Sequence, residues 1–349
     1  MTEIRQLKKT DVARLAEALL KAGYAVIAPV KQHAGRQGDL LLYSEIKVPS
    51  EVRADGYLLP ARSAKEFFLP VTEAVLRYRD AGKETAVEPA VPDTRKRALL
   101  FCRPCDAAAL AAQEAVFAYQ IQDELYLARR RNTAVVTLAC AEPDGYCFCS
   151  AVGLGPAAEK GSDALLLPDG DGYLVKTLSE KGKKLVEAAG AVFAPAAAGA
   201  EDRGRKREAE IASKVTKQLP HQALAKKLDT AFENPFWQDA APACLGCASC
   251  TFLCPVCHCF DVVDEARYGG GVRRRNWDAC QHEYFTLHAS GHNPRHHKSD
   301  RWRQRLMHKF GHAPKRYDLM LCTGCGRCTR VCPVGTDIHE MATRALAAL

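Results

Sequence analysis

The pattern of apolar and polar positions predicts strands alternating with helices through residues 10–190. Helices are predicted where apolar residues recur at helical spacing, at residues 10–22, 106–117 and 180–190. Strands are predicted from short apolar runs, at residues 24–30, 39–46, 97–102 and 133–140, with a hairpin at 163–179. Strand, turn and helix repeated in this order predict an α/β or α+β domain with a partly parallel sheet.

Other segments have less regular patterns. Residues 58–78 predict a short helix that Ser63 caps and Pro70 interrupts, and residues 80–96 predict a polar loop. Residues 191–202 are rich in Ala, Pro and Gly and predict a surface linker. Two amphipathic helices are predicted after it, at residues 207–219 and 221–237.

The chain has sixteen cysteines in 349 residues, in short spacings typical of metal ligands rather than of a disulfide framework. A C-x2-C-x2-C-x3-C-P motif occurs twice, at residues 244–255 and 322–333. Two copies, each closed by Cys-Pro, predict a pair of cubane [4Fe-4S] clusters. The alternative is two zinc sites of four thiolates each, and the third thiol and the Cys-Pro ending of each motif argue against it.

The spacing within each motif also predicts how the ligands are shared. Three closely spaced thiolates can bind three corners of one cube, whereas the fourth points toward the other cube. We therefore assign the ligands across the two motifs, with Cys244, Cys247, Cys250 and Cys332 on one cluster and Cys322, Cys325, Cys328 and Cys254 on the other.

A further group of cysteines follows the predicted strands at 97–102 and 133–140. If these strands are neighbours, as sequential strands usually are, the thiols converge at one sheet edge. This favours a third [4Fe-4S] cluster, for which Asp106 is a substitute ligand, over the alternative of reduced, buried thiols. Cys102 lies inside its strand and is interpreted as structural. The ligands of the third cluster are expected to be Cys105, Cys140, Cys147 and Cys149.

The segment between the two motifs, residues 255–321, is unusually basic. Residues 273–316 contain eleven Arg or Lys, seven His and only three acidic residues, and the whole chain has a formal net charge of +8. We expect this charge to offset negative clusters or to bind an acidic partner protein, in preference to nucleic acid. Three cysteines are left over and are expected to pack beside the clusters, Cys257, Cys259 and Cys280.

These patterns together predict an α+β protein. We expect an N-terminal α/β-type domain with a mixed sheet at residues 1–200, a helical linker at 201–236 and a helical dicluster ferredoxin-like domain at 237–349. The N-terminal residues contain no apolar signal segment, and no apolar run reaches transmembrane length. We therefore expect a cytoplasmic protein without membrane contact, in a reducing medium that suits thiolate ligands.

Several motifs extend over nearly the whole chain, namely Cys105-Asp106, YCFC at 146–149, CLGCASCTFLCPVCHC at 244–259, RRNWDACQ at 274–281, GHNPR at 291–295, RWRQR at 301–305 and CTGCGRCTRVCP at 322–333. In these motifs the chain resembles the iron–sulfur beta subunits of cytosolic NAD(P)-linked [NiFe] hydrogenases, also called sulfhydrogenases. It is similar as well to the A subunit of anaerobic sulfite reductase.

The resemblance implies an electron-transfer subunit of an anaerobic oxidoreductase, without substrate chemistry of its own. Such a subunit relays electrons between a flavin subunit that uses NAD(P)H and a catalytic hydrogenase, sulfite reductase or related subunit. No flavin or NAD is expected in this chain, because no G-x-G-x-x-G fingerprint stands between a predicted strand and helix. The alternative is an iron–sulfur reductase that binds substrate or flavin and acts on its own.

Overall fold

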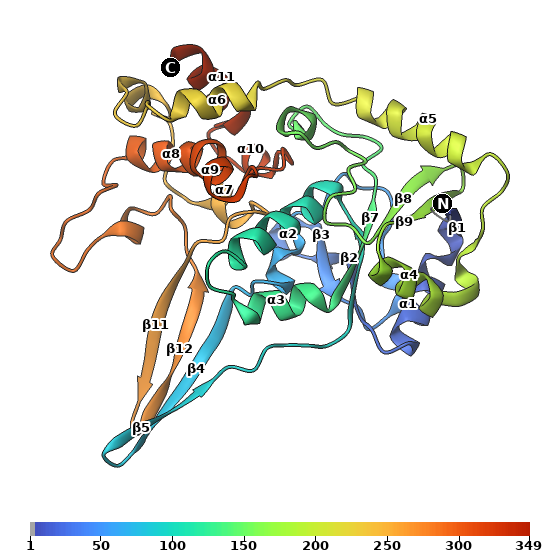
Figure 1. Ribbon diagram of the computed structural model, residues 1–349, viewed down its shortest axis with the longest axis horizontal. Coiled ribbons are helices and arrows are strands. Elements are labelled where there is room, and N and C mark those ends of the chain that lie inside the picture. The colour runs from blue at the N-terminus through green and yellow to red at the C-terminus, as the bar shows by residue number, and fades with distance from the viewer. Residues whose placement is uncertain (1–3) are drawn as a thin grey trace.

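Two sheets and a C-terminal group of helices make up the fold (Figure 1). The computed structural model describes residues 4–349. The strands are β1 (Ile4–Lys8), β2 (Ala25–His33), β3 (Asp39–Glu45), β4 (Thr72–Ala81), β5 (Glu84–Pro89), β6 (Arg97–Cys102), β7 (Thr133–Leu138), β8 (Ala164–Asp169), β9 (Gly172–Thr177), β10 (Ala194–Pro195), β11 (Phe260–Arg267) and β12 (Gly270–Trp277). The helices are α1 (Val12–Lys21), α2 (Pro104–Phe117), α3 (Glu124–Arg131), α4 (Glu180–Ala189), α5 (Ala200–Ser213), α6 (His221–Leu228), α7 (Ser249–Phe252), α8 (Lys298–Leu306), α9 (Ala313–Tyr317), α10 (Arg327–Arg330) and α11 (Ile338–Ala348).

The larger sheet has eight strands in the order β10-β1-β9-β8-β7-β6-β2-β3. Its centre is parallel, because β6 pairs with β2 and β7 and β7 pairs with β8 in the same direction. Both outer parts are antiparallel. The predicted α+β class with a mixed sheet is confirmed, and so is the prediction that the strands at 97–102 and 133–140 are neighbours.

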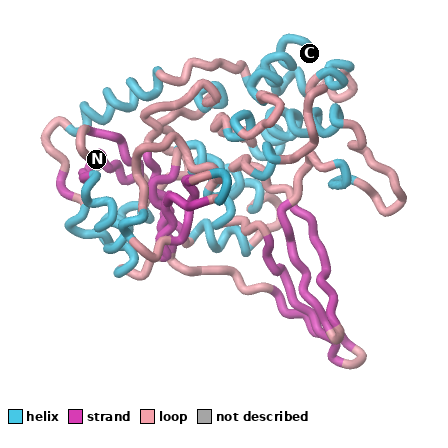
Figure 2. Tube along the Cα trace, turned by 180° about the vertical axis from the view of Figure 1, so that it is seen from behind, coloured by secondary structure: helices cyan, strands magenta, loops and turns pink. Residues whose placement is uncertain are grey.

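Helices cover both faces of the central strands. Every residue of β6 and β7 is buried, which explains why these strands read as continuous apolar runs. Neighbouring residues of β7 face opposite layers: Val136 packs in the apolar cluster of α1 and α4, and Val135 packs in the cluster of α2 and α3. The view from behind shows this eight-stranded sheet apart from the smaller, four-stranded sheet (Figure 2).

The second sheet projects from the body as an arm, which we call the β-arm (Figures 1 and 2). Its four antiparallel strands have the order β11-β12-β4-β5. β4 and β5 come from the N-terminal part of the chain, whereas β11 and β12 come from the basic segment between the cysteine motifs. The β-arm therefore joins segments that lie far apart in the sequence, with Gly270 opposite Arg79 at its outer end and Asn276 opposite Thr72 at its root.

Two sequence predictions are wrong in this region. Residues 58–78 form only a short 3₁₀ turn at Ala64–Phe67 before β4 begins, and the predicted loop at 80–96 contains β5. The strand pairing of β4 with β12 is non-local, so the local pattern around Pro70 could not predict it. The helix expected at 207–219 begins earlier, as α5.

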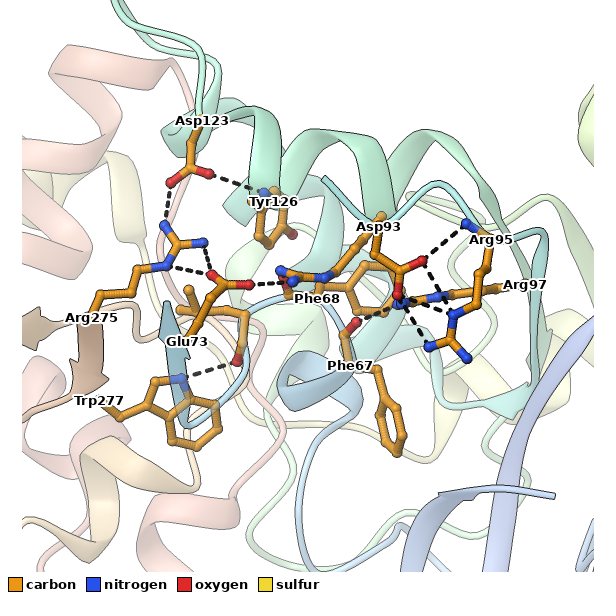
Figure 3. Close-up of polar contacts among 12 residues, drawn as sticks. Phe67, Phe68, Glu73, Asp93, Arg95, Arg97, Asp123, Tyr126, Arg275 and Trp277 are labelled. Carbon is orange, nitrogen blue, oxygen red and sulfur yellow. Dashed lines mark hydrogen bonds and ion pairs between the residues drawn. The ribbon is translucent and has the colours of Figure 1, made fainter. Parts of the chain in front are cut away.

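Buried charges anchor the root of the β-arm, as Figure 3 shows. The carboxylate of Glu73 on β4 accepts from Arg275 on β12, with 2.7 Å between Nε and Oε2, and from Arg129 on α3. Arg275 also pairs with Asp123 at the start of α3, and the indole of Trp277 donates to the carbonyl of Leu69 at 3.0 Å. These contacts hold β12 against α3 and the segment that precedes β4.

The C-terminal helices surround a separate apolar cluster. It contains Trp302 and Phe310 from the basic segment, Leu224 from α6 and Ile338 from α11. Phe148, from the loop that follows β7, is buried in the same cluster. The predicted boundaries at residues 200 and 236 stay predictions. No helix in residues 4–349 combines the length and the apolar character needed to cross a membrane.

Glu73→Gln should lower the free energy of unfolding by about 3–5 kcal/mol, because Arg275 and Arg129 would keep their charge without a buried carboxylate. Denaturant unfolding of the apoprotein measures this. Glu88→Gln is the matched control, since its partner Arg79 is exposed on the same arm and the change should cost at most about 1 kcal/mol. Equal effects of the two substitutions would contradict the anchoring role of Glu73.

Candidate metal centres

The two cysteine motifs adopt the same backbone conformation. In the first motif Gly246 and Ala248 have left-handed φ angles of 68° and 60°, and in the second motif Gly324 and Gly326 have angles of 63° and 68°. A short helical turn follows each pair, as α7 and α10, and these two turns contact each other. Ala248 holds this conformation without the freedom of glycine, at a cost of about 1 kcal/mol. The motifs are therefore a structural repeat as well as a sequence repeat.

Thiols from both motifs line one narrow cavity, which we call site 1. Backbone N–H groups point at two of its sulfurs: Gly246 N lies 3.4 Å from Cys244 Sγ and Thr336 N lies 3.2 Å from Cys332 Sγ. Four convergent thiols with N–H donors are what a [4Fe-4S] cluster requires. Five thiols line site 1, namely the four assigned to it from the sequence, Cys244, Cys247, Cys250 and Cys332, together with Cys328 of the other set.

The second predicted set, which we call site 2, is also brought together: Cys254, Cys322, Cys325 and Cys328. Burial raises the pKa of Cys322 to about 12 and that of Cys328 to about 11, and the nearby thiol of Cys254 adds to both shifts. The ammonium of Lys309 lies 3.4 Å from Cys254 Sγ and donates to the carbonyl of Leu321 at 2.7 Å. Cys322 and Cys328 therefore hold their protons when no metal is bound, and a metal must displace them, whereas a neighbouring thiol and nearby cations lower the pKa of Cys254.

Two buried cations lie beside these thiols, Lys309 at Cys254 of site 2 and Arg305 in the lining of site 1. Lys309 is 4% exposed and Arg305 is 2% exposed, and neither pairs with a carboxylate within residues 4–349. The guanidinium of Arg305 donates to the carbonyl of Cys250 at 3.1 Å and to Cys257 Sγ at 3.8 Å. A buried cation without a carboxylate needs another negative charge nearby, and thiolate-bound clusters supply it.

The third predicted set lines a second narrow cavity, which we call site 3. One thiol lies in the first turn of α2, directly after β6, and the others lie after β7, so the parallel pairing of β6 with β7 brings them together. Arg330 contacts Cys147 Sγ at 3.3 Å while its guanidinium pairs with Asp144 at 2.6 Å. The thiols of site 3 are Cys105, Cys140, Cys147 and Cys149.

Site 2 lies between the other two sites. Its Cys328 lines the cavity of site 1, and its Cys325 lines the cavity of site 3. The loop of the second motif lies close to the loop of site 3. Phe148 N donates to Gly324 O at 2.8 Å, and a Cβ at Gly324 would lie 2.5 Å from Cys149 N. The three sets of thiols therefore form a row.

The remaining sequence candidates have other roles. Asp106, considered as a substitute ligand, binds the guanidinium of Arg327 through both oxygens, at 2.5 and 2.8 Å, and accepts from Tyr43 at 3.0 Å. Its carboxylate is thus fully engaged, and the four cysteines of site 3 do not need it. Cys102 is buried within β6, as expected for a structural residue.

Much of the charge of the basic segment points inward or is paired on the β-arm. On the arm, Arg273 pairs with Asp264 at 2.7 Å and Arg274 pairs with Glu265 at 2.8 Å. Four of its other basic side chains are buried, namely Arg275, Arg301, Arg305 and Lys309. This arrangement favours charge compensation over a phosphate-binding surface.

These buried cations are functional candidates that the cysteine motifs do not reveal. Arg301, Arg305 and Lys309 recur every four residues, on α8 and the π-helical stretch that follows it. A basic stripe at that spacing, on the same side as Trp302 and Phe310, was the signal that could have indicated a buried cationic face.

Comparisons with known proteins agree with this geometry. Residues 243–336 match the family model of the 4Fe-4S dicluster domain, a range that contains all eight cysteines of sites 1 and 2. The chain is 31% identical to the sulfhydrogenase 2 subunit beta of Pyrococcus furiosus over 299 residues, which is 85% of this chain and 86% of that protein. The chain belongs to the sulfhydrogenase beta-subunit family. As a member of this family it is an iron–sulfur electron-transfer subunit, and the predicted [4Fe-4S] chemistry and family are confirmed.

Gly324→Ala should disrupt the contact between sites 2 and 3. The added Cβ meets the backbone of Cys149 in a left-handed conformation, so strain and overpacking together should cost about 2–5 kcal/mol. Gly246→Ala is the matched control, because its φ is similar and its nearest neighbour, Gln281 O, is 3.8 Å away. Thermal unfolding and iron content measure both variants, and the prediction is wrong if the control loses as much stability or iron as Gly324→Ala.

Proposed function

We propose that the chain relays electrons through three [4Fe-4S] clusters, one in each candidate site, with the twelve cysteines of sites 1 to 3 as ligands. In this proposal it connects a flavin subunit that uses NAD(P)H with a catalytic subunit, a hydrogenase, sulfite reductase or related reductase. The single observation that carries the proposal is the row of sites, in which site 2 shares a lining residue with each neighbour.

The burial of the sites suits a relay. Cubane clusters exchange single electrons with little movement of their surroundings. Cys254 and Cys325 of site 2 are 8% and 9% exposed, and Cys147 and Cys149 of site 3 are as buried, at 8% each. Site 1 approaches the surface through the exposed Cys247, and Tyr146, next to site 3, is 47% exposed. Partners can therefore dock near Cys247 and near Tyr146, while the thiols between them are shielded from solvent.

The side chains of the chain itself set the electrostatics of the relay. Lys309 places positive charge beside Cys254 of site 2, and Arg305 places it in the lining of site 1, so each favours the more negative, reduced state of a bound cluster. Arg330 does the same at Cys147 of site 3. Backbone N–H groups of Gly246 and Thr336 stabilise negative charge on the sulfurs of site 1.

Anaerobic reconstitution of the full chain tests the function. We expect iron and sulfide for three cubes per chain, no extractable flavin, and one-electron reduction by dithionite without turnover of a substrate. A bound flavin, or turnover of sulfite or NAD(P)H by the isolated chain, would instead support a reductase that acts on its own and would overturn the relay.

Serine variants test the crossed ligand sets. Cys250→Ser should damage the cluster of site 1 and Cys254→Ser the cluster of site 2, although only three residues separate them in the sequence. Electron paramagnetic resonance of the reduced proteins distinguishes the two losses. Loss of the same cluster in both variants would contradict the crossed assignment.

Lys309→Met should lower the reduction potential of the cluster in site 2 by on the order of 100 mV. Two unit charges about 4 Å apart interact by about 4 kcal/mol at an effective dielectric constant of about 20, and one-electron potentials change by about 59 mV per tenfold change in the equilibrium constant. Lys315→Met is the control, because Lys315 is exposed and pairs with Asp229. A redox titration with an unchanged potential in Lys309→Met would refute this role.

A further inference from the structure

The indole N–H groups of the three tryptophans have different surroundings. Trp237 Nε1 donates to Ala231 O at 2.7 Å. Trp277 Nε1 donates to Leu69 O at 3.0 Å. Trp302 is 4% exposed, and its Nε1 has no acceptor in the part of the chain that the structure describes. An indole can only donate, and it has a single polar atom, so this side chain is left wholly unsatisfied by the protein.

The unsatisfied indole lies at site 1. Trp302, on α8, lines the cavity of site 1 together with the ligand thiols, and it also packs in the apolar cluster of the C-terminal helices. Trp237 is buried in the same apolar cluster, yet its N–H has an acceptor. Burial in this cluster therefore does not by itself leave an indole unsatisfied. The feature that sets Trp302 apart is its place in the lining of site 1.

A second unsatisfied donor lines the same cavity. Arg305 is 2% exposed, and its Nη atoms donate to Thr251 Oγ1 at 3.3 Å and to Cys250 O at 3.1 Å. Its Nε has no acceptor among residues 4–349. Residues three apart share one face of a helix, and the guanidinium lies 5.9 Å from the centre of the Trp302 ring. Two buried donors without acceptors therefore come to site 1 from one face of α8.

These donors need an acceptor that the protein does not supply. A buried N–H without a partner costs its full desolvation, so the functional protein is expected to satisfy it. The sulfurs of a [4Fe-4S] cluster accept such bonds, and the bonds strengthen when the cluster gains an electron. Backbone N–H groups of Gly246 and Thr336 already point at two ligand sulfurs of site 1. An indole N–H in the same lining would act in the same way.

We propose that the indole N–H of Trp302 donates a hydrogen bond to the cluster of site 1 and raises its reduction potential. This inference rests on the proposed function. The indole is a positioning group for charge: it neither bonds covalently to the cluster nor carries the electron. It stabilises an electron at the end of the relay that approaches the surface through the exposed Cys247.

Trp302→Phe tests this in the full reconstituted chain, because phenylalanine keeps an aromatic ring in the apolar cluster and removes only the N–H. Loss of one hydrogen bond to a charged group should make reduction of one cluster about tenfold less favourable, which is about 59 mV for a one-electron couple. Trp237→Phe is the matched control: its N–H is satisfied by Ala231, so every potential should stay unchanged. A redox titration followed by electron paramagnetic resonance measures both variants.

A second readout detects the contact itself. With nitrogen-15 in the indole of every tryptophan, pulsed electron paramagnetic resonance of the reduced protein should show one indole nitrogen coupled to a cluster. The coupling should disappear in Trp302→Phe and remain in Trp237→Phe. It should also disappear in Cys250→Ser, which assigns it to the cluster of site 1.

The outcomes separate the donor role from the relay. An unchanged potential in Trp302→Phe, or a coupling that persists in it, with iron for all clusters present, would overturn the donor role and leave the relay intact. If Trp302→Phe folds poorly or loses iron, the labelled wild-type protein decides, because absence of any indole coupling overturns the role. A wild-type chain that binds no iron would overturn the relay, and the donor role with it.

Discussion

A buried ion pair between Arg327 and Asp106 joins the second cysteine motif to the larger sheet. Both side chains are almost completely buried, at 1% exposure, and two hydrogen bonds connect them. Burying two charges is costly unless every polar atom finds a partner. Here Tyr43 donates to the carboxylate and Arg327 donates to Pro60 O at 3.2 Å, so the pair is well satisfied. The position of site 2 beside site 3 depends on this ion pair, because Arg327 directly follows Gly324 and Gly326, in the loop that contacts site 3.

Charge compensation is the second constraint on the row of thiols. Twelve cysteines close together would repel one another as thiolates, and burial raises the pKa of most of them. The chain places cations beside these sulfurs, namely the buried Lys309 and Arg305 and the partly buried Arg330, which also pairs with Asp144. The basic segment between the motifs therefore has its main role inside the protein.

How far the sequence predicts this molecule depends on how local each feature is. The motif spacing predicts the crossed grouping of the eight C-terminal cysteines, which stays a prediction, and the cavity of site 1 is lined by thiols of both motifs. The group at site 3 could be predicted because β6 and β7 are adjacent apolar runs. The β-arm could not be predicted, because β4 pairs with β12 from a distant segment and no residue near Thr72 indicates its partner. From the sequence Asp106 is only a substitute candidate ligand, and its real partner, Arg327, cannot be predicted because it lies 221 residues away.

The central claim is that the cluster of site 2 lies between the other two and couples them. The most direct measurement is electron paramagnetic resonance of the fully reduced, reconstituted chain, which records magnetic interaction between neighbouring clusters. We expect strong interaction in the wild-type protein, and two nearly independent signals when Cys322→Ser removes the middle cluster. Interaction that survives in this variant unchanged, with the middle cluster absent by iron analysis, would contradict the order of the sites.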